Sequence, residues 1–435
     1  MKIATRDGAA RASQNGPNAR AAVALRPVRV LVIGSGAREH ALCLALARDP
    51  AVRHVVCAPG NAGTAQVAET RTVDPLDPEA VADLADAVAA DLTVIGPEAP
   101  LVNGAADAVR ARGRACFGPS AAAARLEGSK AFAKEVMAAA GVPTAGYRRC
   151  TTRAEVEEAL DAFGPPYVVK HDGLAAGKGV LVTGDRAAAV AHADGETVVV
   201  EEYLDGPEVS LFGISDGTTV LALQPAQDFK RIGDGDTGPN TGGMGAYSPL
   251  PWADPGLRAE VHERVLQPTV DAMRERGTPF QGLLYAGLAL TGKGMRVVEF
   301  NARFGDPETQ VLLPRLRTPL AGLLHAAATG TLAGRTLDWS DDAAVTVVLA
   351  ALGYPGKVTT GQPVDGLVEA GRVADVLHAG TRLEDGKVLT NGGRVLSVTA
   401  TGPTLKEARD RAYEAVGLLR FNGAQYRTDI AAGAI

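Results

Sequence analysis

The segment VVEFNARFGDPETQ, residues 297–310, holds the densest group of side chains able to do chemistry. Glu299 and Asn301 are two positions apart on an expected strand, so both side chains leave the same face. Oxygen ligands at that spacing suit Mg²⁺, which keeps several waters and bridges nucleotide phosphates. Arg303 follows where it can reach a carboxylate or a phosphoryl group, and Asp306 and Glu308 add negative charge suited to an ammonium group. The pattern favours a metal–nucleotide site over the alternative, a solvated strand edge.

A long Gly-rich stretch, QDFKRIGDGDTGPNTGGMGAYSP at 227–249, precedes this segment and shows no hydrophobic periodicity. Long loops inside compact domains are usually functional or disordered, and its six glycines permit close backbone approach. Asp228, Lys230 and Arg231 give both signs of charge at its start. We therefore expect an irregular loop that binds a zwitterionic substrate.

A second Gly-rich segment, GSGAREH at 34–40, stands where a dinucleotide-binding fold places its fingerprint. Glu39 occupies the third glycine position, and the next strand ends at Ala58 without an acid for a ribose hydroxyl, so NAD is disfavoured. What remains is a helix N-terminus with Arg38 and His40 beside exposed backbone N–H groups. That arrangement suits a phosphomonoester; the alternative is a tight turn with incidental polar residues.

A third Gly-rich segment, GLAAGKG at 173–179, is not a P-loop. Its first two glycines are too close, Gly179 stands where a P-loop has Ser or Thr, and a strand follows. A lid over a triphosphate fits better, with Lys170 and Lys178 as point charges, although a plain turn stays open. The segment EEYL at 201–204 suits the edge of an adenine ring, with a solvated strand end as its alternative.

The elements that must position these residues fall into three regions. Short apolar runs alternate with helical segments from Val28 to Phe117, which predicts a parallel α/β layer. Hairpin-like strands and a helix near 257–276 follow, so the middle of the chain is predicted to be α+β. The last part, 343–435, carries apolar strands and an amphipathic helix over 404–419. Helix N-caps are expected at Asp77, Ser120 and Ser129.

Length and composition exclude several classes of protein. The chain has 435 residues, which suggests about three domains, and its net charge of -6 argues against general affinity for nucleic acid. No apolar run reaches the ~18 residues of a membrane span. Four scattered cysteines indicate reduced, mostly buried thiols in a cytosolic protein. Residues 1–26 are basic and lack a secretory core, which favours a disordered tail over a transit peptide.

The ordered strings along the chain resemble the glycinamide ribonucleotide synthetase family of ATP-grasp ligases, from about Val28 to the C-terminus. The matching strings include GSGAREHAL, APGNAGT, IGPEAPLV, LEGSKAF, DGLAAGKGV, EFNARFGDPETQ, GYPG and NGGRVL, together with the Gly-rich stretch at 227–249. The resemblance implies an ATP-grasp fold, preceded by a Rossmann-like α/β domain and followed by a small mixed α/β domain. The implied boundaries are 1–27 for the tail, 28–129, 130–336 with a lid at about 146–205, and 337–435.

The resemblance also implies the reaction. ATP, glycine and 5-phosphoribosylamine would give glycinamide ribonucleotide, ADP and phosphate through glycyl phosphate, in de novo purine biosynthesis. The implied metal ligands, for Mg²⁺ or Mn²⁺, are Glu299 and Asn301. The implied ATP-binding residues are Lys130, Lys170, Gly177, Lys178, Glu201, Glu202, Tyr203, Leu204 and Glu208. The implied substrate-binding residues are Gly36, Arg38, Glu39, Asn61, Glu98, Asp228, Lys230, Gly243 and Arg303, and the implied catalytic residues are Arg303, Asp228, Lys178 and Asp306.

Three positions depart from the family pattern. His171 replaces a small residue, Phe229 replaces a histidine, and the segment 185–196 looks short, so lid packing is expected to differ. Two alternatives remain: an ATP-grasp ligase for another carboxylate and amine, and a non-catalytic nucleotide-binding module. We expect small-molecule substrates, a cytoplasmic location and no nucleic-acid or membrane partner. Transient contact with neighbouring purine-pathway enzymes is left open.

Overall fold

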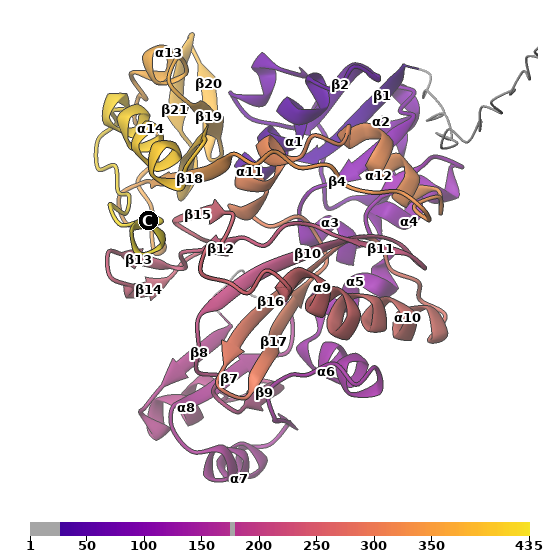
Figure 1. Ribbon diagram of the computed structural model, residues 1–435, viewed down its shortest axis with the longest axis vertical. Coiled ribbons are helices and arrows are strands. Elements are labelled where there is room, and N and C mark those ends of the chain that lie inside the picture. Colours follow the sequence, from indigo (N-terminus) through magenta and orange to yellow (C-terminus); the bar gives the residue numbers. More distant parts are fainter. Residues whose placement is uncertain (1–26, 175–178) are drawn as a thin grey trace, which may run out of the picture.

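The computed structural model of the protein describes residues 27–174 and 179–435. Residues 1–26 of the expected tail, and Gly177 and Lys178 of the expected lid, lie outside this part. Three groups of elements are visible in Figure 1: an α/β layer at the N-terminus, a central antiparallel sheet with a lid beneath it, and a C-terminal sheet.

The N-terminal sheet is parallel throughout, with strand order β3-β2-β1-β4-β5. Its strands are β1 (Val28–Gly34), β2 (Val52–Pro59), β3 (Glu69–Thr70), β4 (Leu92–Ile95) and β5 (Cys116–Phe117). Its helices are α1 (Ala37–Ala47), α2 (Pro78–Ala87), α3 (Glu98–Val102) and α4 (Ala105–Ala111). The predicted parallel α/β layer is therefore confirmed. Strands buried in a parallel sheet are usually continuous apolar runs, and VRVLVI is such a run.

The predicted helix starts are also confirmed. The Asp77 side chain accepts hydrogen bonds from two backbone N–H groups of the first turn of α2. Ser120 caps α5 (Ala121–Gly128), and Ser129 caps α6 (Lys130–Ala139). Each cap satisfies N–H groups that have no partner inside the helix.

The lid is an antiparallel sheet with the order β6-β9-β7-β8. Its elements are β6 (Tyr147–Cys150), α7 (Arg153–Phe163), β7 (Tyr167–His171), β8 (Val180–Thr183), α8 (Arg186–His192) and β9 (Val198–Glu201). It has its own apolar core, which includes Leu160, Val169 and Val198. His171 stacks on His192 at the end of α8 with ring centroids 4.3 Å apart, so the segment expected to be short holds a helix that packs on His171.

The central sheet has the order β11-β10-β16-β17 and is antiparallel. Its strands are β10 (Glu208–Asp216), β11 (Val220–Ala222), β16 (Gln281–Thr291) and β17 (Gly294–Asn301). The helix expected near 257–276 forms as α9 (Leu257–Val261) and α10 (Gln267–Glu275), joined by a π-helical turn, His262–Leu266. Two further helices, α11 (Glu308–Leu312) and α12 (Leu320–Ala328), follow β17.

The C-terminal sheet corrects one prediction. Its order is β12-β15-β18-β22-β19, and the first two strands come from the stretch expected to be an irregular loop. These strands are β12 (Gln227–Asp228), β15 (Gly245–Ser248), β18 (Ala343–Ala350), β19 (Asp375–His378) and β22 (Arg394–Gly402). The stretch also forms a hairpin of β13 (Arg231–Gly233) and β14 (Thr237–Asn240). Periodicity missed these strands because β15 is held by β18, about a hundred residues away in sequence.

The C-terminal region contains two further helices and a hairpin. They are α13 (Leu367–Ala370), the hairpin of β20 (Thr381–Glu384) and β21 (Lys387–Thr390), and α14 (Leu405–Leu418). The amphipathic helix expected over 404–419 is thus confirmed as α14, with Thr404 as its N-cap. All four cysteines are free and buried, as expected. Within the described residues, no helix is long and apolar enough to cross a membrane.

Candidate active site at the end of β17

Glu299 and Asn301 lie at the end of β17, as predicted. The Glu299 carboxylate is partly buried and accepts no hydrogen bond from another residue in 27–174 or 179–435. Burial raises the pKa of Glu299, but the positive charges of Lys230, Lys170, Lys130 and Arg303 outweigh it and hold the pKa below its usual value. Glu299 is therefore an anion with unused oxygen lone pairs and cations around it.

Arg303 connects this strand end to the N-terminal layer. Its Nη2 donates to Asn301 Oδ1 at 3.3 Å and lies 3.3 Å from Glu127 Oε1, while Nε lies 3.3 Å from Glu98 Oε2. Burial favours the neutral guanidine, but the two carboxylates raise the pKa of Arg303 and keep it charged. Glu98, at the start of α3, keeps a lowered pKa because Arg303 and Arg38 outweigh the effect of burial. One guanidinium thus joins β17 to α3 and α5.

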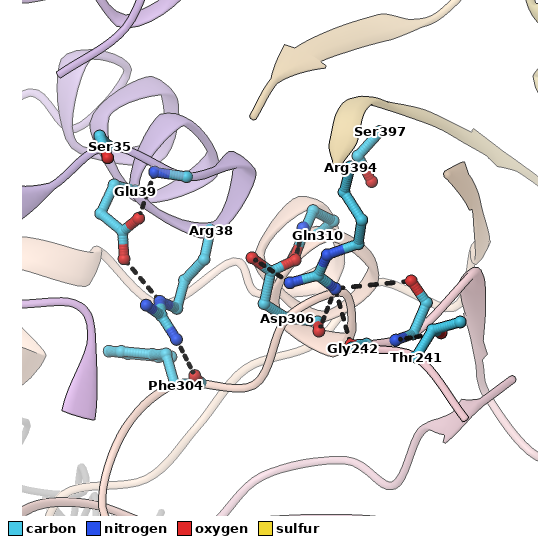
Figure 2. A network of polar contacts seen from close by, with 12 residues as sticks. Ser35, Arg38, Glu39, Thr241, Gly242, Phe304, Asp306, Gln310, Arg394 and Ser397 are labelled. Atoms are coloured by element: carbon cyan, nitrogen blue, oxygen red, sulfur yellow. Dashed lines mark hydrogen bonds and ion pairs between the residues drawn. The ribbon is translucent and has the colours of Figure 1, made fainter. Parts of the chain in front are cut away.

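Arg394 of β22 fixes the turn after β17, as Figure 2 shows. Its Nη2 lies 3.2 Å from Asp306 Oδ2, and its Nη1 donates to the backbone oxygens of Asp306 at 2.8 Å and Gly242 at 2.7 Å. Gln310 donates to the other Asp306 oxygen at 2.7 Å. Gly243 has φ +112°, and an added Cβ would lie 2.4 Å from the Pro307 ring, so only glycine fits there. The C-terminal sheet, the Gly-rich stretch and the turn after β17 meet at this arginine.

The turn between β1 and α1 is arranged differently from the prediction. The Gly36 N–H donates to Glu39 Oε2 at 2.6 Å, and Arg38 contacts Glu39 Oε1 at 2.5 Å and donates to Phe304 O at 3.1 Å (Figure 2). His40 is buried away from this turn and accepts a hydrogen bond from the backbone N–H of His378. The expectation that His40 stands beside exposed N–H groups is wrong, because its ring packs against the C-terminal sheet and Glu39 caps the Gly36 N–H.

Asn61 holds three segments together. Its side-chain amide donates to Ser35 O and to His378 O at 2.8 Å each. Its Oδ1 accepts from the backbone N–H groups of Gly63 at 2.8 Å and Thr64 at 2.9 Å. The amide is committed to protein contacts, and these contacts place the β1–α1 turn against β19.

Asp228 and Lys230 border a group of carboxylates. Lys230 forms an ion pair with Glu208 at the start of β10, and its pKa is raised because Asp228, Glu208 and Glu299 outweigh the effect of burial. Burial raises the pKa of Asp228 to about 7; Lys230 opposes that rise, and Glu308 adds to it. Both signs of charge are present, as the sequence predicted.

Glu308, at the start of α11, is a buried carboxyl group with two hydroxyl donors. Its Oε1 accepts from Tyr285 at 2.6 Å and from Ser210 at 3.1 Å. Burial raises the pKa of Tyr285 well above its ordinary value, with Glu308 adding to the rise, so the phenol stays a donor. The two hydroxyl donors, from β16 and β10, hold the carboxylate in place.

The expected nucleotide side is built from α6, β7 and β9. Lys130 donates to Gly173 O at 2.9 Å. Lys170 donates to Val298 O at 3.0 Å and lies 3.0 Å from Glu201 Oε2. After β9, Glu202 accepts from the Gly146 N–H at 3.3 Å. Tyr203 is 44% exposed and Leu204 is partly buried, so this segment presents backbone and ring surface to an open side.

Sequence reasoning missed three residues that organise the site: Lys134, Glu127 and Arg394. Arg394 lies in the string NGGRVL, so its place in a family motif was available as a signal. Lys134 lies one helical turn after Lys130 on α6, which puts both on one face. Glu127 lies in the string LEGSKAF, but its partner Arg303 comes from a distant part of the chain, so its contact could not be predicted locally. Glu308 was predicted to add negative charge, and the structure shows which hydroxyl groups hold it.

A cleft of about 680 Å³ lies between the lid and the C-terminal sheet. It is lined by β8, by residues of the β13–β14 hairpin, and by the loop from Gly353 to Gly356. Of the residues predicted to bind ATP or metal, none that the structure describes lines it. By its described lining residues, the cleft is therefore distinct from the charged group at the end of β17.

Comparison with known proteins identifies the family. The N domain, the ATP-grasp (A) domain and the C domain of phosphoribosylglycinamide synthetase match residues 28–127, 128–309 and 344–433. A phosphoribosylamine–glycine ligase of Streptomyces coelicolor is 67% identical over 413 residues, covering 94% of this chain and 99% of the relative. The chain belongs to the phosphoribosylamine–glycine ligase family. It is an ATP-dependent ligase that joins glycine to 5-phosphoribosylamine in purine biosynthesis.

Further phosphoribosylamine–glycine ligases support this assignment. One of Mycobacterium leprae is 57% identical over 415 residues, covering 93% of this chain and 97% of the relative. The crystal structure of one from Thermotoga maritima has a TM-score of 0.81 at 34% identity and covers 93% of this chain and 100% of that chain. A biotin carboxylase domain of Hydrogenobacter thermophilus, with a TM-score of 0.68 at 19% identity, shows the fold alone. The family, fold and reaction predicted from the sequence are confirmed.

Proposed function

We propose that ATP, glycine and 5-phosphoribosylamine meet at the end of β17, between the lid, the N-terminal layer and the C-terminal sheet. The observation that carries this proposal is the position of Arg303, which contacts Asn301 on one side and Glu98 of α3 on the other. A guanidinium there can neutralise a transferring phosphoryl group from ATP while facing the segment proposed to bind the ribosylamine.

Glu299 and Asn301 would hold a divalent metal, Mg²⁺ or Mn²⁺. The residues present fit such an ion, because Glu299 is ionised with unused lone pairs and both side chains supply hard oxygen donors. The described residues contain no group of three His, Cys, Asp or Glu side chains suited to a metal, so phosphate oxygens and water would complete the coordination. Bound there, the ion would neutralise charge on the phosphates of ATP.

The nucleotide would lie between the lid and β17. Lys130 and Lys170 supply positive charge for the phosphates, and Glu201, Glu202, Tyr203 and Leu204 border the base, with Glu208 towards the ribose. Gly177 and Lys178 of the segment 173–179 would cover the phosphates. The physical support is the cluster of cations around Glu299, which is the charge pattern that a triphosphate needs.

The reaction would proceed through glycyl phosphate. The glycine carboxylate attacks the terminal phosphorus of ATP, ADP leaves, and the ribosylamine nitrogen then displaces phosphate from the acyl carbon. Asp228 would hold the glycine ammonium group, with Lys230 and Glu208 setting its charge, and Asp306 would face the amine. Arg303 would stabilise charge on the phosphoryl group.

The ribosylamine would bind at the β1–α1 turn. Gly36, Arg38 and Glu39 lie beside Asp306, since an added Cβ on Gly36 would lie 3.5 Å from Asp306 Oδ2. Because the Asn61 amide is committed to four hydrogen bonds, its proposed part is to place this turn. Gly243 would let the Gly-rich stretch approach the turn after β17.

The wider assignments belong to the same proposal. The domain boundaries are 28–129, 130–336 with a lid at about 146–205, and 337–435, and the separate core of the lid supports its limits. Small molecules would be the only ligands, without nucleic acid, and a cytoplasmic location follows from the shared pool of ATP and glycine. Contacts with other purine-pathway enzymes would be transient.

Trapping the intermediate tests this proposal. With ATP, Mg²⁺, glycine and hydroxylamine but without ribosylamine, the enzyme should form glycine hydroxamate, because hydroxylamine attacks an acyl phosphate. Arg303→Lys should form less hydroxamate, and Arg335→Lys, on an exposed arginine, should match the wild type. Ligation without any hydroxamate in the trapping assay would contradict the intermediate.

A further inference from the structure

A buried cluster of three charged side chains joins the lid to the central sheet. Glu201 Oε2 lies 3.1 Å from Lys134 Nζ and 3.0 Å from Lys170 Nζ. The relative exposures are 2% for Lys134, 4% for Lys170 and 3% for Glu201. The three come from α6, β7 and β9, so the cluster crosses from the central part into the lid.

The two lysines are anchored to neighbouring positions of β17. Lys134 donates to Thr144 Oγ1 at 2.8 Å, and Thr144 donates to Val297 O at 2.6 Å. Lys170 donates to the next carbonyl, Val298 O, at 3.0 Å. Both ammonium groups are therefore tied to the strand that ends at Glu299 and Asn301.

The charges in this cluster do not balance. Two ammonium groups share one carboxylate oxygen, and Glu201 Oε1 is buried without a hydrogen-bond partner among the described residues. A buried excess positive charge is costly unless an anion approaches it. Lys130 adds a further positive charge near Lys170, and the Glu299 carboxylate offsets part of this positive charge. The anion that this arrangement awaits is a nucleotide phosphate, if ATP binds where we proposed.

We propose that Lys134 is a positioning residue of the nucleotide site, which holds the Glu201 carboxylate so that Lys170 can serve a nucleotide phosphate. This inference rests on the proposed role of Lys170. Without Lys134, Glu201 would keep Lys170 as its only cation, since breaking a buried pair leaves an uncompensated charge. With Lys134 present, Glu201 stays paired when Lys170 turns to the phosphate.

The pH dependence follows from the same contacts. Burial lowers the pKa of Lys134 to about 8; Glu201 opposes that shift and Lys170 adds to it. The groups that face the Lys134 ammonium are Glu201 on β9, Lys170 on β7, the Thr144 hydroxyl and the Tyr147 ring of β6, 5.5 Å away. Above the pKa the neutral amine no longer balances Glu201. Binding of ATP should therefore weaken between pH 7 and pH 9.

Binding measurements with ATP and adenosine test the proposal, because only ATP carries phosphates. In Lys134→Met at pH 7, affinity for ATP should fall by about tenfold or more, the effect of losing one charge-assisted hydrogen bond. Affinity for adenosine should stay at the wild-type value. Lys134→Arg, which keeps its charge at every pH used, should bind ATP at pH 7 and lose the weakening at pH 9.

Two controls separate this inference from the proposal on which it rests. Lys387→Met, on the exposed β20–β21 hairpin, should bind both ligands normally. Lys170→Met should weaken ATP but not adenosine; if it weakens neither, the role of Lys170 is wrong and the inference falls with it. If Lys170→Met weakens ATP while Lys134→Met does not, or weakens both ligands equally, only the role of Lys134 is overturned. Should Lys134→Met fail to fold, the wild-type and Lys134→Arg pH profiles decide, and equal profiles overturn it.

Discussion

Arg394 of β22 and Asp306 of the turn after β17 are joined twice. Arg394 Nη2 lies 3.2 Å from Asp306 Oδ2, and its Nη1 donates to the Asp306 backbone oxygen at 2.8 Å. A guanidinium can make both contacts because its donors form a rigid planar fork. The C-terminal sheet thus sets the position of a residue proposed to face the ribosylamine, and on that proposal the sheet would take part in the reaction.

Replacing Arg394 should therefore impair catalysis more than stability. Arg394→Lys keeps the charge but cannot reach Asp306 and Gly242 together, so we expect kcat/KM to fall by about tenfold or more. The KM for 5-phosphoribosylamine should rise while the KM for ATP stays unchanged, because we propose that the nucleotide binds at α6, β7 and β9 instead. Steady-state kinetics with each substrate varied in turn would show this split. Equal changes in both KM values would contradict a local role, and Arg411→Lys, away from the site, provides the control.

The raised pKa of Asp228 predicts a pH dependence of both binding and stability. Its folded pKa of about 7 lies above the ordinary value of 3.8, chiefly because the carboxyl is buried. The folded state therefore binds this proton more tightly than the unfolded state. The resulting contribution to the free energy of unfolding is complete below about pH 4 and is lost as pH rises through 7. In our proposal the charged form of Asp228 holds the glycine ammonium group, so the KM for glycine should fall as pH rises over the same range.

Asp228→Asn tests both parts. Denaturant titrations from pH 5 to pH 8 should show the variant gaining stability relative to the wild type, and its KM for glycine should be high and independent of pH. Asp385→Asn, in an exposed turn, should follow the wild type in both measurements. Parallel stability profiles for Asp228→Asn and the wild type would show that Asp228 titrates normally.

Tyr285→Phe should destabilise the protein. The phenol donates to buried Glu308 at 2.6 Å, and its loss leaves Ser210 as the remaining described donor to Oε1. A buried carboxylate that loses one donor costs about 1–3 kcal/mol of unfolding free energy. Chemical denaturation would measure the loss, with the exposed Tyr426→Phe as the matched control. An unchanged midpoint would mean that Glu308 is satisfied without Tyr285.

Asn61→Ala should loosen the β1–α1 turn from β19. Four side-chain hydrogen bonds disappear, including those to Ser35 O and His378 O. We expect a loss of about 1–3 kcal/mol in unfolding free energy and a raised KM for 5-phosphoribosylamine alone. Asn391→Ala, at an exposed position, should change neither. A raised KM for ATP in Asn61→Ala would contradict this placement.

Local sequence signals predicted much of the fold, because helix caps and apolar strands depend on residues that are close together in the sequence. The caps at Asp77 and Ser129 are decided within one helical turn. The apolar run before Glu299 and Asn301 predicted the strand that carries them. The family resemblance added the order of the domains and the reaction, which local patterns do not contain.

The features that sequence reasoning missed depend on contacts between distant segments. β15 became a strand because β18 pairs with it. His40 is turned away from the β1–α1 turn by its contact with His378, over three hundred residues later. The contact of Lys134 with Glu201 could not be predicted locally, because Glu201 comes from β9 and Lys134 from α6. Phe229, which replaces the usual histidine, is covered by Arg427, 4.8 Å from the ring centroid.

The most direct test of the central claim is ADP release from ATP with Mg²⁺, freshly made 5-phosphoribosylamine and either glycine, alanine or aspartate. The account predicts release that needs both glycine and the ribosylamine, is lost in Glu299→Ala, and is unchanged in Glu414→Ala on the exposed side of α14. Release that persists in Glu299→Ala would contradict the placement of the active site at the end of β17.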